Sequence, residues 1–339
     1  MLILAIESSC DETSIAILRN GKILSNVISS QYFHSKYGGV IPELASRAHV
    51  QTISSIYHQA LNEAGTQIED IEAIAVTNQP GLMGSLIVGT NFAKGLALKH
   101  NLPIVPVNHI EGHLYSGYLQ EPDLSFPAIC LVVSGGHTVL FYVHSYNKYD
   151  IIGLTRDDAA GEAFDKISKM LGLGYPGGPI IDRLAKEGNP AAYNFPRSMI
   201  NSGDLDFSFS GLKTSFRTFL HKNFPGEITE GNKKDLAASV QAAIVDVLTF
   251  KTISAAKEYK VKNIIVAGGV SANSQLKKDM TEKAAKRGMH AVFPSIQLSM
   301  DNAAMIGFLA EQKLSESGAD PFHDFTFTAA ANALRAKRK

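Results

Sequence analysis

The sequence predicts an α/β protein built from two similar lobes with a cleft between them. The chain has 339 residues, which is long enough for two domains. Short apolar runs alternate with longer segments of helical periodicity. A strand, polar loop, strand unit in residues 3–18 recurs in residues 129–143. Internal duplication of this kind indicates two similar lobes around a cleft.

The N-terminal unit begins with an apolar, β-prone run at residues 2–7, followed by a polar turn at residues 7–14. Residues 14–18 are apolar again, and Asn20-Gly21 predicts a hairpin turn into a third strand. The polar loop is either an ordinary connection or a cradle for a phosphate or carboxylate. Ligands of open α/β sheets lie at the carboxyl ends of strands, so we expect both polar loops to face the cleft.

Residues 42–64 have apolar positions at helical spacing, and Gly65 fits just past the helix end. A strand at 71–77 follows, and then a glycine-rich helix after Gln79-Pro80-Gly81. Each glycine inside a helix costs about 1 kcal/mol relative to alanine. We therefore expect close packing at this helix, with close approach of a ligand as the alternative.

The second half of the chain repeats these patterns and adds helices. We expect strands at 128–133, 138–143 and 263–267, and helices at 161–171, 180–186 and 235–259, with a last helix starting near Asp301. Residues 175–179 are expected to form a rigid turn, and residues 150–225 an insertion that carries helices. The Gly268-Gly269 step after a strand would let backbone amides approach a ligand closely.

Composition and charge exclude several classes of protein. The 32 basic and 32 acidic residues cancel, so net charge gives no indication for nucleic acid, and any such contact must rest on a local patch. The basic tail at 335–339 is such a patch, with a simply solvated tail as the alternative. Cys10 and Cys130 are the only cysteines, which argues against a disulfide framework and fits a reducing compartment. The apolar run at 2–6 is too short for a signal peptide or a membrane span. These features predict a cytoplasmic protein.

The segment His109-Ile110-Glu111-Gly112-His113 follows a predicted strand at 102–107. On a helix, the two histidines lie four positions apart on one face, as in metal sites. The alternative is a pair of ordinary polar residues on a solvated face. The segment differs from the zinc-protease motif H-E-x-x-H, because Glu111 is two residues after the first histidine and points to nearly the opposite face.

Asp301 is the candidate for a third ligand. Its alternative role is to cap the last helix, which is worth about 1 kcal/mol. Two histidines and a carboxylate leave coordination positions open for a substrate oxygen, and they suit iron, zinc or manganese.

Two nucleotide-binding motifs are excluded. Gly172, Gly174 and Gly177 have the G-x-G-x-x-G spacing, but they follow a helix rather than a strand. Gly211-Leu212-Lys213-Thr214 lacks the upstream glycine and the Gly-Lys pair of a P-loop.

Eight longer motifs occur in one order along nearly the whole chain. They are residues 7–13 (ESSCDET), 38–43 (GGVIPE), 109–113 (HIEGH), 133–138 (VSGGHT), 161–166 (GEAFDK), 175–179 (YPGGP), 207–214 (FSFSGLKT) and 267–273 (AGGVSAN). Through these motifs the chain resembles the family of transferases that make threonylcarbamoyladenosine in tRNA, formerly labelled O-sialoglycoprotein endopeptidases. The tail after about Phe325 does not align.

The resemblance implies the actin/Hsp70/sugar-kinase fold, with one lobe at residues 1–112 and about 298–325, a second at 113–297, and a basic tail at 326–339. It implies transfer of the threonylcarbamoyl group from threonylcarbamoyl-AMP to N6 of adenosine 37, in tRNAs that read codons beginning with A. It also implies two bacterial partners, a catalytically silent paralogue (TsaB) and a small ATPase (TsaE), and no membrane.

The site residues also follow from the resemblance. His109, His113 and Asp301 would hold one divalent metal, Fe(II) ahead of Zn(II). The adenylate would be held by Val132, Val133, Ser134, Gly135, Gly136, Asp165, Gly178, Asp182 and Asn273. Backbone amides of the Gly135-Gly136 turn suit the phosphate. Two acids would repel a phosphate, so Asp165 and Asp182 are expected at the ribose or adenine, and Asn273 at the sugar or the phosphate.

Two other functions are compatible with parts of the sequence. A phosphotransferase or ATPase of the same fold would need no metal at the histidine pair. A non-enzymatic scaffold would be expected to lack the metal trio. Asp11 and Glu12 have two possible roles. They orient the attacking amine or the loop, or they have a structural role.

Overall fold

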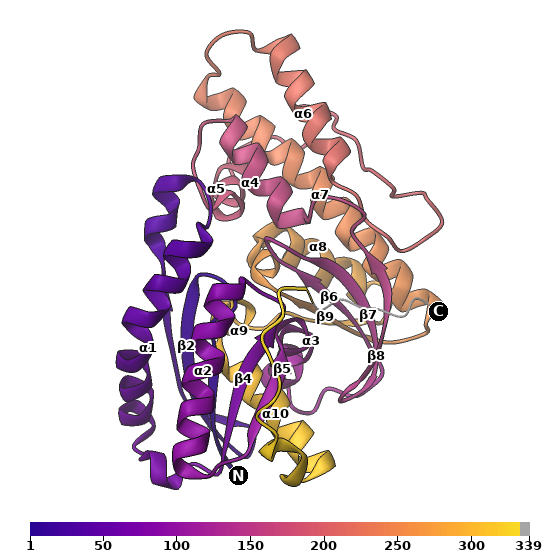
Figure 1. The fold of residues 1–339 in the computed structure, drawn as a ribbon. Helices are drawn as coiled ribbons and strands as arrows, with labels where there is room; N and C mark the ends of the chain where they lie inside the picture. Colours follow the sequence, from indigo (N-terminus) through magenta and orange to yellow (C-terminus); the bar gives the residue numbers. More distant parts are fainter. Residues whose placement is uncertain (333–339) are drawn as a thin grey trace. The chain divides into compact units, whose positions relative to one another are not determined.

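The structure is a computed structural model that describes residues 1–332, so the basic residues 335–339 of the tail lie outside the described part (Figure 1). The described chain forms two compact units, residues 1–122 with the segment from Gln297 onward, and residues 123–296. The lobe boundaries implied by the resemblance remain predictions.

The first unit holds a five-stranded sheet of order β3-β2-β1-β4-β5. Its strands are β1 (Leu2–Glu7), β2 (Glu12–Arg19), β3 (Lys22–Ser30), β4 (Ala73–Gln79) and β5 (Ile104–Asn108). The β1–β2–β3 hairpins are antiparallel, and β4 and β5 continue the sheet in parallel. The predicted strand, polar loop, strand pattern and the hairpin turn are confirmed.

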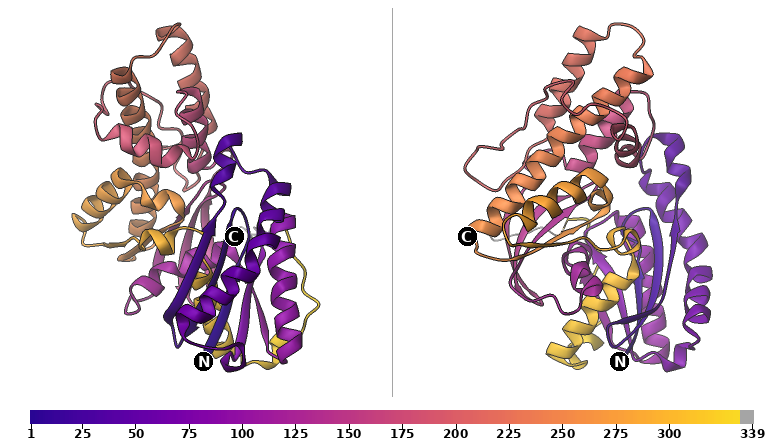
Figure 2. Two further views of the ribbon diagram at one scale, coloured as in Figure 1. Left: turned by 90° about the vertical axis from the view of Figure 1, so that its left-hand side faces the viewer. Right: turned by 180° about the vertical axis from the view of Figure 1, so that it is seen from behind.

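Helices pack on both faces of this sheet. The helices of the unit are α1 (Pro42–Ala64), α2 (Met83–His100), α3 (His109–Gln120), α9 (Ile296–Ser299) and α10 (Ala303–Ser317), with 3-10 turns at Tyr32–Tyr37, Ile68–Asp70 and Asp320–His323. The α1 and α2 helices share a core with Leu4 and Ile6 of β1, whereas Gly307 of α10 packs on Ala5 and Leu18 from the other face. Figure 2 shows α10 (yellow) and α1 (indigo) on opposite sides of the strands.

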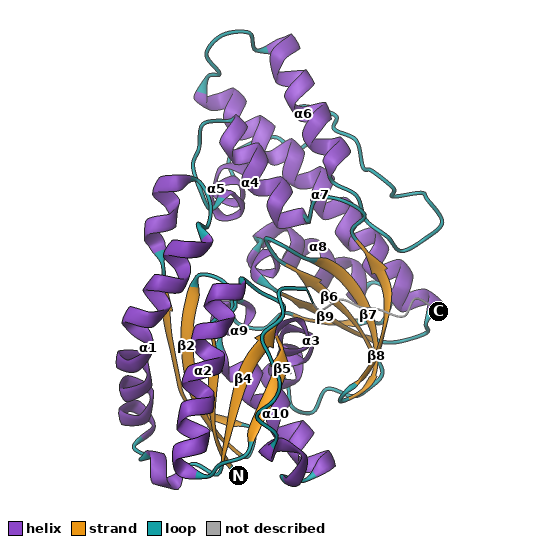
Figure 3. Ribbon diagram, viewed as in Figure 1, coloured by secondary structure: helices purple, strands orange, loops and turns teal. Residues whose placement is uncertain are grey.

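The second unit repeats the sheet order as β8-β7-β6-β9-β10, with the same antiparallel and parallel pairings (Figure 3). Its strands are β6 (Ala128–Val133), β7 (Thr138–Ser145), β8 (Lys148–Leu154), β9 (Asn263–Ala267) and β10 (His290–Val292). Because β1 to β5 and β6 to β10 pair in the same pattern, the duplication predicted from the sequence is confirmed.

The helices of the second unit are α4 (Ala160–Met170), α5 (Gly177–Ala185), α6 (Ser210–Asn223), α7 (Glu230–Glu258) and α8 (Ser274–Ala285), with a 3-10 turn at Gly269–Ala272. Among the described helices, α7 alone is long and apolar enough to cross a membrane, and 83% of its apolar window is buried inside the protein. Its apolar residues Leu236, Val240 and Ile244 lie in the core of the unit.

One local prediction differs from the structure. The segment 175–179 is predicted as a rigid turn, but Gly177, Gly178 and Pro179 form the first turn of α5. At the glycine step after β9, a Cβ on Gly268 would lie 2.5 Å from the carbonyl oxygen of Val133, so this glycine lets two chain segments approach each other. Gly269 has open space where a Cβ would lie, and the approach of a ligand to this step stays a prediction.

Candidate metal centre

The histidine pair is placed by the start of α3. Asn108, the last residue of β5, caps the helix, since its side-chain oxygen accepts hydrogen bonds from the amides of Ile110 (2.9 Å) and Glu111 (3.3 Å). The cap places His109 at the first helical position and His113 one turn later on the same face. Both side chains are buried, with 7% and 0% of their surface exposed. The predicted helical placement is confirmed.

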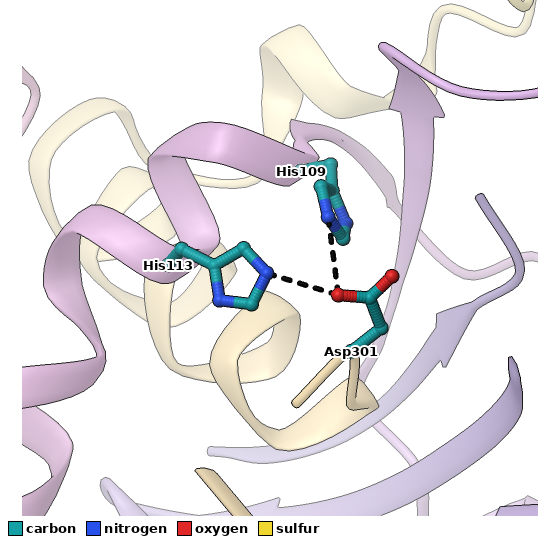
Figure 4. Close-up of side chains that lie close together, drawn as sticks. All are labelled: His109, His113 and Asp301. Carbon is teal, nitrogen blue, oxygen red and sulfur yellow. Dashed lines mark hydrogen bonds and ion pairs between the residues drawn. The ribbon is translucent and has the colours of Figure 1, made fainter. Parts of the chain in front are cut away.

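Asp301 lies just before α10, and its neighbour Asn302 caps that helix by accepting the amide hydrogen of Met305 at 3.2 Å. The alternative role of Asp301 as the cap is therefore wrong. Its carboxylate faces the histidines instead, as Figure 4 shows. Oδ1 lies 3.0 Å from Nε2 of His113 and 3.4 Å from Nε2 of His109.

Gly112, between the two histidines, allows α10 to approach α3. A Cβ there would lie 2.9 Å from Cδ1 of Ile306 and 3.1 Å from Cγ of Met305. A larger residue would therefore push against the first turn of α10, the segment that follows Asp301.

The three donor atoms fit a common divalent ion. They lie within 4.8 Å of one another. Nitrogen and oxygen ligands bind zinc at about 2.0–2.2 Å, so two donors on one ion are separated by about 2.8–3.6 Å for angles at the metal between about 90° and 110°. The contacts of Asp301 with the two histidines, at 3.0 and 3.4 Å, match this separation. His109, His113 and Asp301 can therefore hold a metal ion.

The other nitrogen of His109 faces the end of β1. Nδ1 lies 3.1 Å from Oε2 of Glu7 and 3.1 Å from the hydroxyl of Ser9. Glu7 is fully buried, accepts the Ser9 amide at 2.6 Å, and also accepts the hydroxyl of Thr77. The sequence indicates only a connection or an anion cradle for this loop and does not predict its contact with His109. The only sequence signal is an acid that ends a buried strand.

Burial and the carboxylates set opposite pKa shifts on the two histidines. Burial lowers the pKa of His109, but Asp301 and then Glu7 outweigh it and hold the pKa well above its usual value. Burial lowers the pKa of His113, and Asp301 does not compensate. Burial raises the pKa of Asp301, yet His109 and His113 hold it well below its usual value. The cluster therefore favours an ionised carboxylate with a cation beside it.

Glu12, at the start of β2, lies in the electrostatic field of the same cluster. Burial, followed by Asp301 and Asp11, holds the pKa of Glu12 well above its usual value. Burial and the Asp11 carboxylate also raise the pKa of the Cys10 thiol. Glu12 therefore favours its neutral form, and its role stays open.

Glu111 forms an ion pair with α10. Its Oε2 lies 3.2 Å from Nζ of Lys313 on α10. The general base that a zinc protease needs beside its metal is therefore not supplied by Glu111, as the spacing predicts.

The predicted adenylate residues all lie in the second unit. Val132 and Val133 are buried in β6, which is paired with β7 on one side and β9 on the other. Val133 ends β6 and leads into the turn, and the contact of both residues with a ligand stays a prediction. In the turn itself, the Ser134 amide donates to the His137 carbonyl, while Gly135 and Gly136 are exposed with open space where a Cβ would lie.

The start of α4 packs directly against this turn. A Cβ on Gly161 would lie 2.7 Å from Cα of Gly135 and would also clash with the Ser134 carbonyl oxygen. The Gly161 amide donates to that carbonyl at 3.2 Å. The absence of a side chain at Gly161 therefore lets α4 pack closely against the turn and hold Gly135 and Gly136 in position.

Asp165 accepts the Gly177 amide at 2.7 Å and so binds the start of α5, where Gly178 also lies. Burial raises the pKa of Asp165 despite the amides of Gly177 and Gly178. Asp182 accepts both the amide (3.1 Å) and the hydroxyl (2.8 Å) of Ser274.

Asn273 caps α8 through the Leu276 amide at 2.9 Å and donates to Gln241 at 2.7 Å. With Asp165 and Asp182 it therefore helps to hold α4, α5, α7 and α8 in fixed positions. Their contacts with a ligand remain a prediction.

The family model for tRNA N6-adenosine threonylcarbamoyltransferase (TsaD) matches residues 22–308. Proteins of that name from Clostridium perfringens (strain SM101 / Type A) and Clostridium botulinum (strain Hall / ATCC 3502 / NCTC 13319 / Type A) are 52% and 51% identical over 311 residues. In both cases the match covers 91% of this chain and 91% of the relative.

Two solved structures share the fold at 14% sequence identity. Full-length HypF in its phosphate- and nucleotide-bound form has a TM-score of 0.65, with 94% of this chain and 47% of that chain covered. The activator of 2-hydroxyisocaproyl-CoA dehydratase from Clostridium difficile with bound ADPNP has a TM-score of 0.55, with 94% and 98% covered. The predicted actin/Hsp70-like α/β fold is confirmed.

Proposed function

The chain belongs to the TsaD family of tRNA N6-adenosine threonylcarbamoyltransferases, and on that premise we propose the details of its reaction. The donor is threonylcarbamoyl-AMP. The acceptor is N6 of adenosine 37 in tRNAs that read codons beginning with A. The amine attacks the carbamoyl carbonyl carbon, its N–C bond forms as the bond from that carbon to the phosphate oxygen breaks, AMP leaves, and the amine proton passes to solvent.

The observation that supports this proposal is the convergence of His109, His113 and Asp301 on one point. We propose that they hold one divalent ion, Fe(II) ahead of Zn(II), since two imidazoles and one carboxylate are typical of non-haem iron sites. When bound, the ion would act as a Lewis acid that polarises a substrate oxygen. The protein's own part is to hold three ligands on α3 and before α10, which leaves further coordination positions for the substrate.

We propose that the second unit binds the adenylate. The exposed amides of Gly135 and Gly136 suit its phosphate, because backbone N–H groups at such a turn attract anions. Asp165 and Asp182 then lie at the ribose or adenine, with Gly178 at the helix start, and Asn273 lies at the sugar or the phosphate. The nucleotides held by HypF and by the dehydratase activator, two proteins of this fold, support a nucleotide here.

We further propose that the protein works in the cytoplasm, with no membrane, alongside the silent paralogue TsaB and the ATPase TsaE. The neutral net charge supports a need for partners, since phosphate contacts with tRNA require cations.

The test is reconstitution with synthetic threonylcarbamoyl-AMP and a tRNA that carries A37, followed by quantification of the modified nucleoside. A tRNA with G37 is the matched acceptor control. We expect product with A37 only, and loss of product when a chelator removes the metal. Product that is insensitive to the chelator would contradict the metal assignment. Steady ATP hydrolysis without the metal, and no transfer, would favour a phosphotransferase or ATPase instead.

A further inference from the structure

We propose that Glu7 is a positioning residue for the metal, acting on it through His109. The inference rests on the metal in the proposed function. Glu7 ends β1, is fully buried, and lies 3.1 Å from Nδ1 of His109. The opposite nitrogen of the same ring, Nε2, is the one that faces Asp301 at 3.4 Å.

The first consequence concerns the tautomer of His109. An ionised carboxylate can only accept hydrogen bonds, so the Nδ1 beside it must carry the hydrogen. The lone pair of the ring is then on Nε2, the nitrogen that faces the proposed ion. A carboxylate that accepts the hydrogen of the other ring nitrogen commonly fixes the ring orientation and tautomer of a metal-bound histidine.

The Glu7 carboxylate is itself held on both oxygens. Oε1 accepts the amide of Ser9 at 2.6 Å, and Oε2 accepts the hydroxyl of Thr77 on β4. The Thr77 side chain is fully buried. Because one donor lies in the loop just after β1 and the other on the neighbouring strand β4, Glu7 is a rigid support for the imidazole.

The second consequence concerns charge. A divalent ion between two neutral imidazoles and the Asp301 carboxylate would leave one positive charge in a buried cluster. Buried charge is costly unless it is paired. The carboxylate of Glu7, on the far side of the His109 ring, supplies the second negative charge.

The test is a titration of the metal-free full-length protein with Co(II) and Zn(II), before any activity is measured. Glu7→Gln keeps an acceptor for the Nδ1 hydrogen but loses the charge, and Glu7→Ala loses both. We expect affinity to fall on the order of 10-fold for Gln and 100-fold for Ala. Nitrogen-15 imidazole spectra of the Zn(II)-loaded wild type should show His109 protonated at Nδ1, a signature that a merely structural role would not require.

Glu111→Gln is the matched control. It also removes one negative charge, but from α3, where the wild-type Glu111 carboxylate faces Lys313. It should bind both metals as the wild type does. Thr77→Val keeps the shape of its side chain and removes one donor to Glu7, so it should bind metal several-fold more weakly even if the Glu7 variants fail to fold.

The outcomes separate this inference from the proposed function. If the wild type binds neither ion at stoichiometric concentration, the metal site itself is refuted. If the wild type binds metal and the Glu7 variants bind it equally well, the role of Glu7 is refuted. If the Glu7 variants do not fold, a Thr77→Val variant with unchanged metal affinity refutes the role of Glu7. In every case, a His109 ring that is protonated at Nε2 in the Zn(II)-loaded protein also refutes it.

Discussion

Nε2 of His113 lies 3.0 Å from Oδ1 of Asp301, although the two residues are 188 positions apart in the chain. The contact joins His113, one turn into α3 after β5, to Asp301, the residue just before the cap of α10. Asn108 starts one helix and Asn302 caps the other, so neither ligand is used for capping. Both are therefore available to an ion.

Replacing either ligand should abolish metal binding. His113→Ala removes a nitrogen donor, and Asp301→Asn keeps the shape of the side chain but removes its charge. We expect loss of stoichiometric divalent binding, and a fall in transfer rate on the order of 100-fold or more, since a Lewis acid contributes several kcal/mol. Metal content and the modified nucleoside are measured together. His58→Ala, on the exposed part of α1, should change neither.

The histidine pair could be predicted because its signal is local: a strand, then two histidines at helical spacing. Asp301 could not be separated from Asn302 by sequence, since both residue types cap helices and the two are adjacent. The contact of Glu7 with His109 spans 102 positions and follows no periodicity. It arises only when β1, β4 and β5 are paired side by side.

The sheets were predictable for a related reason. The strand, polar loop, strand unit repeats, and the two sheets then pair in the same order. The start of α5 could not be predicted from the local sequence pattern. Gly177 and Gly178 suggest a turn by composition, but the Asp165 carboxylate accepts the Gly177 amide and so starts the helix there.

Two glycines of α2 should respond in opposite ways to alanine. A Cβ on Gly89 would clash with the buried hydroxyl of Ser8, which donates to the Ser85 carbonyl at 3.0 Å. We expect Gly89→Ala to destabilise the fold by about 1–3 kcal/mol, because overpacking and a lost hydrogen bond outweigh helix propensity.

Gly95, on the exposed side of the same helix, has open space where an alanine methyl would lie, with no neighbouring atom within 4 Å of that position. Gly95→Ala should stabilise the fold by about 0.5–1 kcal/mol. Chemical denaturation of the two variants beside the wild type measures both. Equal changes in unfolding free energy for the two variants would show that helix propensity alone, rather than packing, determines the effect of Gly89→Ala.

Asp157 should stabilise the start of α6 in a pH-dependent way. Phe209 cannot cap this helix, and Asp157 accepts the amides of Phe209 (2.8 Å) and Ser210 (3.2 Å) in its place. Asp157→Ala should cost about 1 kcal/mol at neutral pH. Burial raises the pKa of Asp157, but the hydroxyls of Ser208 and Ser210 and these amides outweigh it and lower the pKa.

A lowered folded-state pKa means that the unfolded chain takes up the proton first as pH falls. The stabilisation by Asp157 is therefore full above the unfolded pKa of about 3.9, and it is lost as pH falls through the folded pKa. The difference in unfolding free energy between wild type and Asp157→Ala should be constant near neutrality and shrink in acid. Asp123→Ala, at an exposed site, should show no such trend.

His49 should make the first unit sensitive to mild acid. Its ring is buried in α1, with Nδ1 2.7 Å from the Thr13 hydroxyl and Nε2 3.0 Å from the Cys10 carbonyl. Because a carbonyl only accepts, Nε2 carries the hydrogen and Nδ1 accepts from Thr13, which is the neutral ring. Burial lowers the pKa of His49 and outweighs the Cys10 carbonyl and the Glu7 charge, which raise it.

With its folded pKa below the unfolded value of about 6.5, His49 binds more protons in the unfolded chain. Its contribution is therefore present above about pH 6.5 and is lost as pH falls through the folded pKa. His49→Gln can still donate an amide hydrogen to Cys10 but does not titrate, so its unfolding free energy should depend less steeply on pH between about 5 and 7. His58→Gln on the exposed side of the same helix should keep the wild-type slope. An unchanged slope in His49→Gln would mean that another group controls the acid sensitivity.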